Sequence, residues 1–528
     1  MKCAPELTSS RTDASALTDQ RSQSQREEDM THAQIRGSSL FLAGRLLSVG
    51  INFCAQVLMV RFLSVAHYGA FAYGLSVVAF LQLFATLGLQ DAISRYVPIY
   101  YENGEYEKLF GAIFLVAGVI FGTGILVVAG VVGFPGLLSR FLTHEQLALR
   151  LLPILIFLVP VEASDAMLDG LFASFASARA IFFRKYILGP GLKLGVVVLL
   201  IWRNATVVFL AYAYVSASVL AVLMYIWMYL RLLRDYQLLK HINAKPLRVP
   251  AQEILAFIIP GLSSLLATVA IPTVSILLLG SIRTMSDVAY YRVVLPLAQL
   301  NGIVMASFTL LYTPAAARLL AKAHFGAINT LYWKTAAWMS VLSFPIFAAT
   351  FSFAKPLTIF LYGNRYVPSV PVLALLALAS YFNTSLGFNL QTLKVLGRLR
   401  FITVVSVLSL VIDIALNMLL IPRLGALGAA IASVGAAIIY NLLLQLGLLL
   451  TSKFNAFDRR YLSIYATVAL SAVGLLVVQN FTSMNLYLAL PVAGVVSLFV
   501  VAVTKRKLNI TETFPELLSL PFARLLLS

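Results

Sequence analysis

Three carboxylates interrupt the apolar stretch LVPVEASDAMLDGLFAS, residues 158–174. On an α-helix, at about 100° per residue, Glu162, Asp165 and Asp169 lie within roughly 60° of one another and share one face. Ionisable side chains inside a membrane are costly, so such a face looks into a cavity or toward another charge. Mutual repulsion and burial disfavour the state in which all three acids are ionised.

Asp413 is a further acid within an apolar run. It lies in the sequence VIDIALN, and Asn417 follows one helical turn later. An intramembrane acid is a candidate for a functional site by default. We therefore treat Asp413 as a candidate ion-coupling residue, with a hydrogen bond to a neighbouring helix as the alternative.

Four basic side chains also fall within apolar runs. Lys193, in GPGLKLGVVVL, lies well inside its run, where it would face a cavity, pair with an acid or extend toward the membrane surface. Arg292 (YYRVVLPLAQ), Arg45 (FLAGRLLSVG) and Lys334 (YWKTAAW) lie about one turn from the end of a run. For these three, the alternative to a cavity is that the long side chain reaches the headgroup region.

The composition is that of a polytopic membrane protein. Of 528 residues, 60% are hydrophobic and 11% are charged, and the mean hydropathy is +0.90. Soluble domains carry about 25% charged residues. The net charge of +18 is spread over short connections between apolar runs. This distribution is typical of membrane topology and excludes a basic nucleic-acid-binding face.

The sequence lacks the motifs of an enzyme. The five histidines are scattered without metal-ligand spacing, and two cysteines leave little scope for a disulfide framework. No phosphate loop of the form G-x-x-x-x-G-K-[ST] occurs, and neither does a nucleophile elbow. We therefore predict no catalytic activity, no cofactor and no metal site.

Apolar windows of about 20 residues predict an all-α protein with about 14 transmembrane helices. The predicted spans are 38–60, 68–90, 109–133, 150–174, 186–202, 205–230, 251–279, 287–312, 330–354, 370–392, 402–421, 425–450, 461–480 and 484–504. Lys and Arg gather in alternate connections, and this bias predicts that both termini are cytoplasmic.

The chain divides into two predicted lobes. A disordered polar cytoplasmic tail, 1–37, precedes an N-lobe of six spans, 38–230; a basic cytoplasmic linker, 231–250, leads to a C-lobe of six spans, 251–450; two extra spans, 451–504, and a cytoplasmic tail, 505–528, follow. A shift of 222 residues aligns VAHYGAF, 65–71, with DVAYYRV, 287–293. This shift pairs the second predicted span with the eighth. Six spans separate the two, so both copies have the same orientation in the membrane, as in parallel repeats.

Three stretches carry a family resemblance. RFLSVAHYGAFAYGLSVVAFLQLFATLGLQDAISRYVP (61–98), FLYGNRYVPSVPVLALLALASYFNTSLGFNLQTLKVLGRLR (360–400) and NMLLIPRLGALGAAIAS (417–433) resemble bacterial polysaccharide flippases of the multidrug/oligosaccharidyl-lipid/polysaccharide exporter superfamily. The resemblance implies a flippase that moves undecaprenyl-diphosphate-linked oligosaccharides from the cytoplasmic to the outer leaflet by alternating access. The implied pathways are O-antigen, capsule or exopolysaccharide biosynthesis, and the implied location is the bacterial inner membrane.

The resemblance also gives the charged residues possible roles. Arg45, Lys193 and Arg292 are the first candidates for contact with the pyrophosphate, and Lys334 is a further substrate-binding candidate. Basic side chains suit this role because Lys offers a point charge and Arg a bidentate grip. For the acids of residues 158–174, three roles are open: ion coupling, pairing with Lys193, and binding of sugar hydroxyls.

Competing functions come from the same superfamily and from outside it. A cation-coupled multidrug exporter and a lipid II flippase are alternatives, and a membrane-embedded polymerase or ligase is disfavoured because no long outer connection is present. Expected partners are the lipid-linked oligosaccharide, membrane lipids and, through the pathway, a polysaccharide polymerase and glycosyltransferases. No nucleic acid is expected.

Overall fold

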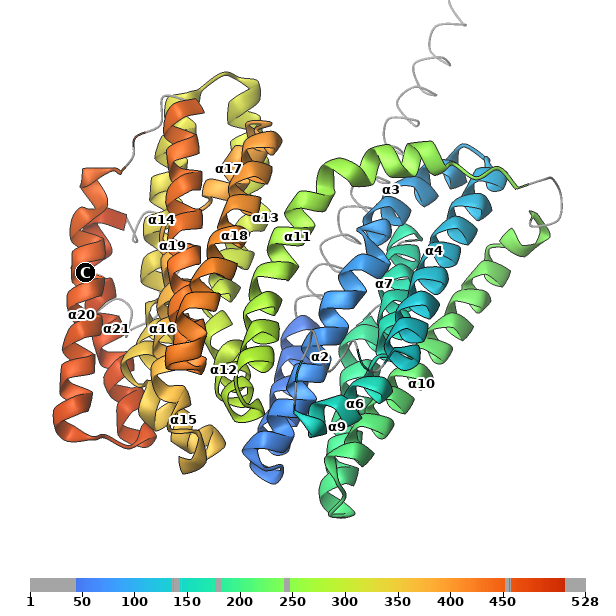
Figure 1. Cartoon of the computed structure of the whole chain (residues 1–528). Coiled ribbons are helices and arrows are strands. Elements are labelled where there is room, and N and C mark those ends of the chain that lie inside the picture. Colours follow the sequence, from blue (N-terminus) through green and yellow to red (C-terminus); the bar gives the residue numbers. More distant parts are fainter. Residues whose placement is uncertain are drawn as a thin grey trace, which may run out of the picture.

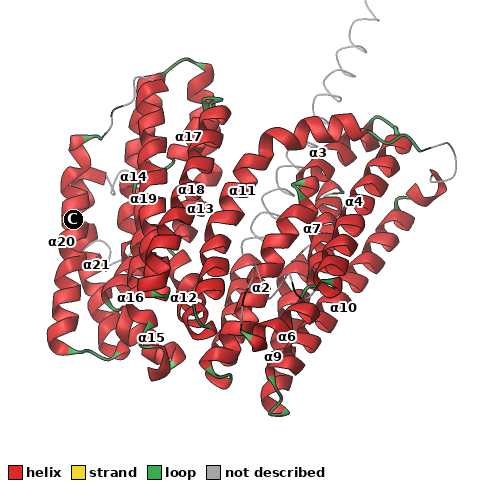
Figure 2. Cartoon of the chain, in the orientation of Figure 1, coloured by secondary structure: helices red, strands yellow, loops and turns green. Residues whose placement is uncertain are grey.

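The computed structural model describes residues 44–134, 136, 143, 145–175, 182–241, 247–451, 455 and 457–508. The predicted tail 1–37 and the end of the chain, 509–528, lie outside the described residues. Every secondary-structure element of the described residues is a helix (Figure 2). Long apolar helices suit a bilayer because each satisfies its own backbone hydrogen bonds.

The first half of the chain forms one group of helices, which we call the N-lobe. Its elements are a first helix, Gly44–Phe62, followed by α2 (Val65–Thr86), α3 (Leu89–Glu102), α4 (Tyr106–Gly133), α6 (Gln146–Leu155), α7 (Leu158–Ser174), the π-helix η1 (Phe182–Leu188), α9 (Gly189–Trp202), α10 (Val207–Asp235) and the 3₁₀-helix η2 (Leu238–His241).

The second half forms a group that we call the C-lobe, followed by two further helices. Its elements are α11 (Ala251–Ile282), α12 (Met285–Gln299), α13 (Gly302–Ala321), α14 (Phe325–Phe347), η3 (Ala348–Ser352), α15 (Ala354–Tyr362), η4 (Asn364–Tyr366), α16 (Ser369–Ser385), α17 (Asn389–Val395), α18 (Leu399–Leu424) and α19 (Ala426–Thr451). The short helix η5 (Arg459–Tyr461), α20 (Leu462–Thr482) and α21 (Leu486–Leu508) complete the described chain.

The predicted all-α membrane fold is confirmed. Within the described residues, 11 helices are long and apolar enough to cross a membrane, or 13 if each of two bent pairs is one span. The 32-residue helix α11 coincides with the predicted seventh span. The long helices α2 and α10 each begin at a capping side chain. For example, the Ser64 side chain accepts a hydrogen bond of 3.2 Å from the backbone N–H of His67 at the start of α2.

Two predicted spans are bent in the structure. Residues 150–174 form α6 and α7, which meet at 43°, and residues 287–312 form α12 and the start of α13, which meet at 41°. Pro160 explains the first bend, because it has no N–H to donate to the carbonyl of Ile156 four residues earlier. The bend places α7 and its three acids at an angle to the helix before it.

α2, α11 and α12 join the two lobes. Figure 1 shows α11 beginning near the ends of α3 and α4 and running toward the C-lobe helices. α2 packs against both α11 and α12. The approach is close enough that a Cβ atom at Gly69 would overlap the carbonyl oxygen of Met285, and one at Gly280 would overlap the Tyr73 ring.

Candidate substrate and ion sites

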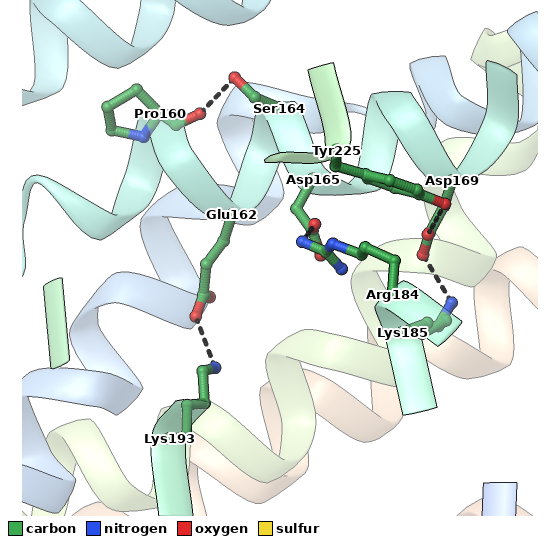
Figure 3. A network of polar contacts seen from close by, with 9 residues as sticks. All are labelled: Pro160, Glu162, Ser164, Asp165, Asp169, Arg184, Lys185, Lys193 and Tyr225. Atoms are coloured by element: carbon green, nitrogen blue, oxygen red, sulfur yellow. Dashed lines mark hydrogen bonds and ion pairs between the residues drawn. The ribbon is translucent and has the colours of Figure 1, made fainter. Parts of the chain in front are cut away.

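The three acids of α7 face the two helical segments that follow it in the chain. Glu162 Oε1 lies 3.7 Å from Lys193 Nζ, and Asp169 Oδ2 lies 2.6 Å from Lys185 Nζ. Asp165 forms an ion pair with Arg184 (Figure 3). The sequence predicts pairing with Lys193 as one alternative for these acids. The structure gives Lys193 to Glu162 and supplies a separate base to each of the other two.

The π-helix η1 supplies two of the bases from adjacent positions. Arg184 and Lys185 reach Asp165 and Asp169, which are one helical turn apart on α7. π-helical segments are rare and occur frequently at functional sites. Sequence reasoning assigned both bases to a cytoplasmic connection, and therefore missed them. The adjacent pair in FFRKYIL, about two turns before an intramembrane lysine, was the available signal.

Aromatic rings enclose the Arg184 pair. The Tyr225 ring of α10 lies with its centroid 4.5 Å from the guanidinium carbon of Arg184, and its hydroxyl donates to Asp169 Oδ1 at 3.2 Å. Phe172 stacks on the other face of Tyr225 at 4.4 Å between centroids. This packing leaves Arg184 only 5% exposed. A guanidinium over an aromatic face is stabilised by the ring quadrupole, especially when water is excluded.

A cavity of about 340 Å³ lies beside this charge network. Its lining includes all three acids and all three bases, together with the amides of Asn52 and Gln82. The buried Ser218 hydroxyl also lines it and has no hydrogen-bond partner within the described chain. Because each acid has a base, the cavity is polar but close to charge-balanced.

A second cavity of about 200 Å³ lies between the lobes. Lys193 and Asn52 line it as well as the first cavity, and Arg292 enters it from α12. Its described lining contains two bases and no acid. Arg292 forms no ion pair among the described residues. This cavity therefore offers positive charge from both lobes to an anion.

Gln56 connects the lobes along the wall of the second cavity. Its Nε2 donates to the backbone carbonyl of Val293 at 2.9 Å and to the Tyr68 hydroxyl at 3.3 Å. Lys193 Nζ lies 4.7 Å from the centroid of the Tyr214 ring. Lys193 is thus positioned between Glu162 on one side and the inter-lobe cavity on the other.

The other two predicted basic residues lie elsewhere. Arg45 is exposed near the start of the first described helix, three and seven residues before Ser48 and Asn52 of the first cavity's lining. Helical spacing puts Arg45 on the same face as these two residues, beyond the cavity. Lys334 is exposed on α14 and lines neither cavity.

Asp413 lies in the C-lobe in a cluster of neutral polar groups. Its side chain is fully buried on α18, and Oδ2 accepts from the Ser275 hydroxyl of α11 at 3.2 Å. Asn417 Nδ2 donates to the Asp413 carbonyl at 2.8 Å and to Ser275 Oγ at 3.1 Å. Ser433 and Tyr291 extend the cluster: the Ser433 hydroxyl lies 3.3 Å from the Ser275 hydroxyl and 2.9 Å from the Tyr291 hydroxyl.

Two oxygens of this cluster have no partner among the described residues: Oδ1 of Asp413 and Oδ1 of Asn417. No base forms an ion pair with Asp413 within the described chain. A buried carboxylate without a countercharge is costly, so a bound proton or a small hard cation would stabilise it. Sequence reasoning missed the hydroxyl groups around Asp413, because Ser and Tyr are ordinary residues of membrane helices.

Reciprocal arginine contacts hold the lobes together at one end of the molecule. Arg61 Nε donates to the Leu361 carbonyl at 2.9 Å and its Nη2 to that of Phe360. Arg365 Nη2 donates in the opposite direction, to the carbonyls of Val60 and Arg61. We call these contacts the arginine clamp. It closes the end of the molecule that the basic-residue bias predicts to be outer.

The fold defines a multi-pass membrane protein with a polar cavity between its two groups of helices, and solved structures share this fold. A lipid II flippase MurJ in an inward closed conformation is 14% identical, with a TM-score of 0.66 over 89% of this chain and 99% of that chain. An inward-facing multidrug resistance MATE family transporter of the MOP superfamily is 14% identical, with a TM-score of 0.62 over 76% of this chain and 95% of that chain.

A third structure with this fold is a MOP superfamily transporter from Pyrococcus furiosus, described as having a binding pocket of reverse polarity. It is 15% identical, with a TM-score of 0.51 over 79% of this chain and 95% of that chain. A comparison with curated protein sequences gives no match. The family model for polysaccharide biosynthesis proteins matches residues 35–320. The chain therefore belongs to the polysaccharide biosynthesis protein family.

Proposed function

We propose that this protein is a flippase for undecaprenyl-diphosphate-linked oligosaccharides. It moves repeat units from the cytoplasmic to the outer leaflet of the bacterial inner membrane for O-antigen, capsule or exopolysaccharide biosynthesis. The inter-lobe cavity is the observation that carries the proposal: Lys193 and Arg292 approach it from different lobes, and no acid is present in its described lining. A pyrophosphate there gains two charge-assisted contacts.

Alternating access is supported by the position of this cavity. Transporters built from parallel repeats bind substrate between their lobes. In the proposed orientation, with both termini cytoplasmic, the arginine clamp closes the outer side, and its release would open the cavity to the outer leaflet. Arg45 would meet the substrate earlier, on the cytoplasmic approach to the first cavity.

Asp413 is the proposed ion-coupling residue. The side-chain oxygens of Asp413 and Asn417 that have no partner among the described residues suit a proton or Na⁺. The cluster joins α11, α12, α18 and α19, so binding there would change how these helices pack. The acids of α7 are proposed instead to hold the bases of the first cavity in position. Their pairing argues against the multidrug exporter alternative, in which unpaired acids would receive a cationic drug.

The test is to measure lipid-linked saccharides in cells that lack the protein, by mass spectrometry with leaflet-selective labelling. We expect an undecaprenyl-linked oligosaccharide to accumulate on the cytoplasmic leaflet, and its mass identifies the repeat unit. Cells that carry Lys193→Gln or Arg292→Gln in place of the wild-type protein should still accumulate the oligosaccharide. Cells that carry Lys322→Gln, at an exposed site away from both cavities, should not accumulate it. Accumulation of lipid II supports the lipid II alternative; sensitivity to cationic drugs without accumulation supports the exporter.

A further inference from the structure

Arg61 of the arginine clamp has a counterpart in the C-lobe. A shift of 222 residues along the chain places Arg61 on Arg283 and Tyr68 on Tyr290. Arg61 lies at the end of the first helix, just before α2, and Arg283 lies at the end of α11, just before α12. The two arginines therefore occupy equivalent places in the two lobes.

The ends of two further helices agree with the same shift. α9 ends at Trp202 and α18 ends at Leu424. In the C-lobe, Arg283 donates to carbonyls in the last turn of α18, from Nε to Ile421 at 3.2 Å and from Nη2 to Pro422 at 2.8 Å. A guanidinium suits this position, because the last carbonyls of a helix lack intrahelical donors and carry the negative end of its dipole.

Arg61 makes a different contact in this state of the molecule. Within the described chain, its guanidinium donates to Leu361 and Phe360 of α15, across the boundary between the lobes. The carbonyls of the N-lobe that correspond to the acceptors of Arg283 are those of Leu199 and Leu200, in the last turn of α9. The N-lobe thus has the equivalent arginine and the equivalent helix end, without the contact between them.

The end of α9 can accept a further donor. The Leu199 carbonyl accepts the backbone N–H of Arg203 at 2.9 Å, and the Leu200 carbonyl accepts that of Ala205 at 3.0 Å. A carbonyl oxygen has two lone pairs, so each retains one. The C-lobe shows both lone pairs in use, because the Ile421 carbonyl accepts a backbone N–H at 2.9 Å as well as the arginine.

The first helix brings Arg61 to the level of these carbonyls. Asn52 of this helix and Lys193 of α9 line both cavities together, and Met59 and Val197, further along the same two helices, line the second. The two helices therefore run side by side in the same direction, as α11 and α18 do in the C-lobe. The next residues along this pair are Arg61 and the last turn of α9.

We propose that Arg61 has a partner in each of two states. In the closed state it holds the carbonyls of α15. When the outer end opens, it turns to the carbonyls of Leu199 and Leu200, in the arrangement that Arg283 keeps in the C-lobe. The existence of an open state rests on the proposed alternating access. The exchange leaves the Arg61 guanidinium with acceptors in both states, so Arg61 guides the opening without favouring either end point.

Arg365, the other half of the clamp, has no such second partner. The shift places it on Thr143, which is not basic. Its contacts with the carbonyls of Val60 and Arg61 join the lobes, and opening separates them. The two arginines of the clamp therefore differ in role: Arg365 stabilises the closed state alone, whereas Arg61 contributes to both states.

The test is labelling of Tyr290→Cys, beside the clamp, by a water-soluble thiol reagent in a Cys3→Ser/Cys54→Ser background of the purified full chain in detergent micelles. Arg365→Gln should raise the labelling rate roughly 10-fold or more, because charge-assisted hydrogen bonds are lost from the closed state alone. Arg61→Gln should change the rate by less than about threefold, since a contact of equal strength in two states shifts no population. It should still lower the unfolding temperature, because both states lose a contact.

Two further variants calibrate these readouts. Arg283→Gln removes a contact within one lobe and should lower the unfolding temperature without changing the labelling rate. Arg150→Gln, at an exposed site on α6, should change neither. Arg61→Gln should therefore resemble Arg283→Gln and differ from Arg365→Gln.

Two results would overturn the proposal. Labelling of Arg61→Gln as fast as that of Arg365→Gln would show that Arg61 holds only the closed state. An unfolding temperature of Arg61→Gln equal to that of wild type would show that its contacts contribute in neither state. The labelling uses no substrate, so a failure of the flippase proposal appears in the measurement of lipid-linked saccharides and leaves these results unchanged.

Discussion

The acids of the N-lobe and the acid of the C-lobe have opposite surroundings. Glu162, Asp165 and Asp169 each face a base and line a cavity, whereas Asp413 is fully buried among hydroxyls and an amide. A paired acid already has its countercharge, so removing it leaves a base unneutralised. An unpaired buried acid must obtain a proton or cation from outside. This difference is the basis of the proposed structural role for the first set and of the proposed ion coupling for the second.

Asp413→Asn tests the proposed ion-coupling role of Asp413 and should have the largest effect on transport. The amide keeps the shape and hydrogen-bonding capacity of the side chain, and no base loses a partner, so the fold should remain stable to within about 1 kcal/mol. Dependence of transport on a Na⁺ or proton gradient should be lost completely. The measurement is flipping of a lipid-linked oligosaccharide in proteoliposomes with and without each gradient.

The same assay on Asp169→Asn supplies the control. This variant removes an acid of the paired set, and the gradient dependence should persist even where the rate falls. If Asp413→Asn retains full gradient dependence while Asp169→Asn loses it, the roles assigned to the two lobes are reversed.

Breaking the Asp165–Arg184 pair tests the proposed structural role of the acids of α7. Arg184 is almost fully buried, so Asp165→Asn leaves its charge without a partner in a poorly solvated site. Removal of one partner of a buried pair costs about 3–5 kcal/mol. We expect a lower unfolding temperature, measured by tryptophan fluorescence in detergent micelles.

The double variant Asp165→Asn/Arg184→Met distinguishes charge from packing. Both charges are absent, so much of the lost stability should return, although the stacking of the guanidinium on Tyr225 is also removed. Equal stability of Asp165→Asn and wild type would show that the pair does not stabilise the fold.

Loss of an arginine-clamp contact should have an effect of intermediate size on the closed state, and this effect depends on neither set of acids. Hydrogen bonds from a charged donor contribute about 1.5–3 kcal/mol. Arg365→Gln should therefore raise the population of the open state by roughly 10-fold or more. The measurement is labelling of Tyr290→Cys, at a position whose ring meets that of Tyr366 beside the clamp, by a membrane-impermeant thiol reagent in a Cys3→Ser/Cys54→Ser background. Unchanged labelling would show that other contacts hold this end closed.

The sequence predicts the spanning helices well, because each needs about 20 apolar residues and little else. It also predicts the shared face of Glu162, Asp165 and Asp169, since that depends only on spacing along one helix. The lining of the first cavity by all three agrees with this expectation. The bend at Pro160 was detectable in principle, but an apolar window does not register a missing backbone donor.

Partners across helices were not predictable in the same way. The pairing of Asp165 with Arg184 depends on the packing of η1 against α7, and the π-helical geometry changes which side chains face the acids. Ser275 and Ser433 around Asp413 give no signal in an apolar run. The sequence identifies the charges inside the membrane, whereas the assignment of one base to each acid requires the fold.

The smallest effect on stability is expected at the longest of the three ion pairs. Glu162 and Lys193 are 3.7 Å apart, and each side chain is about 30% exposed, so Glu162→Gln should cost at most about 1 kcal/mol. Unlike the other variants, Glu162→Gln should strengthen the binding of substrate. Lys193 borders both cavities, and without Glu162 its full charge is directed to the anion between the lobes. We expect Glu162→Gln to bind undecaprenyl diphosphate severalfold more tightly than wild type in a titration of the purified protein, and Glu162→Gln/Lys193→Gln to bind it more weakly. Tighter binding in both variants would place the pyrophosphate away from Lys193 and leave Arg292 as its main contact.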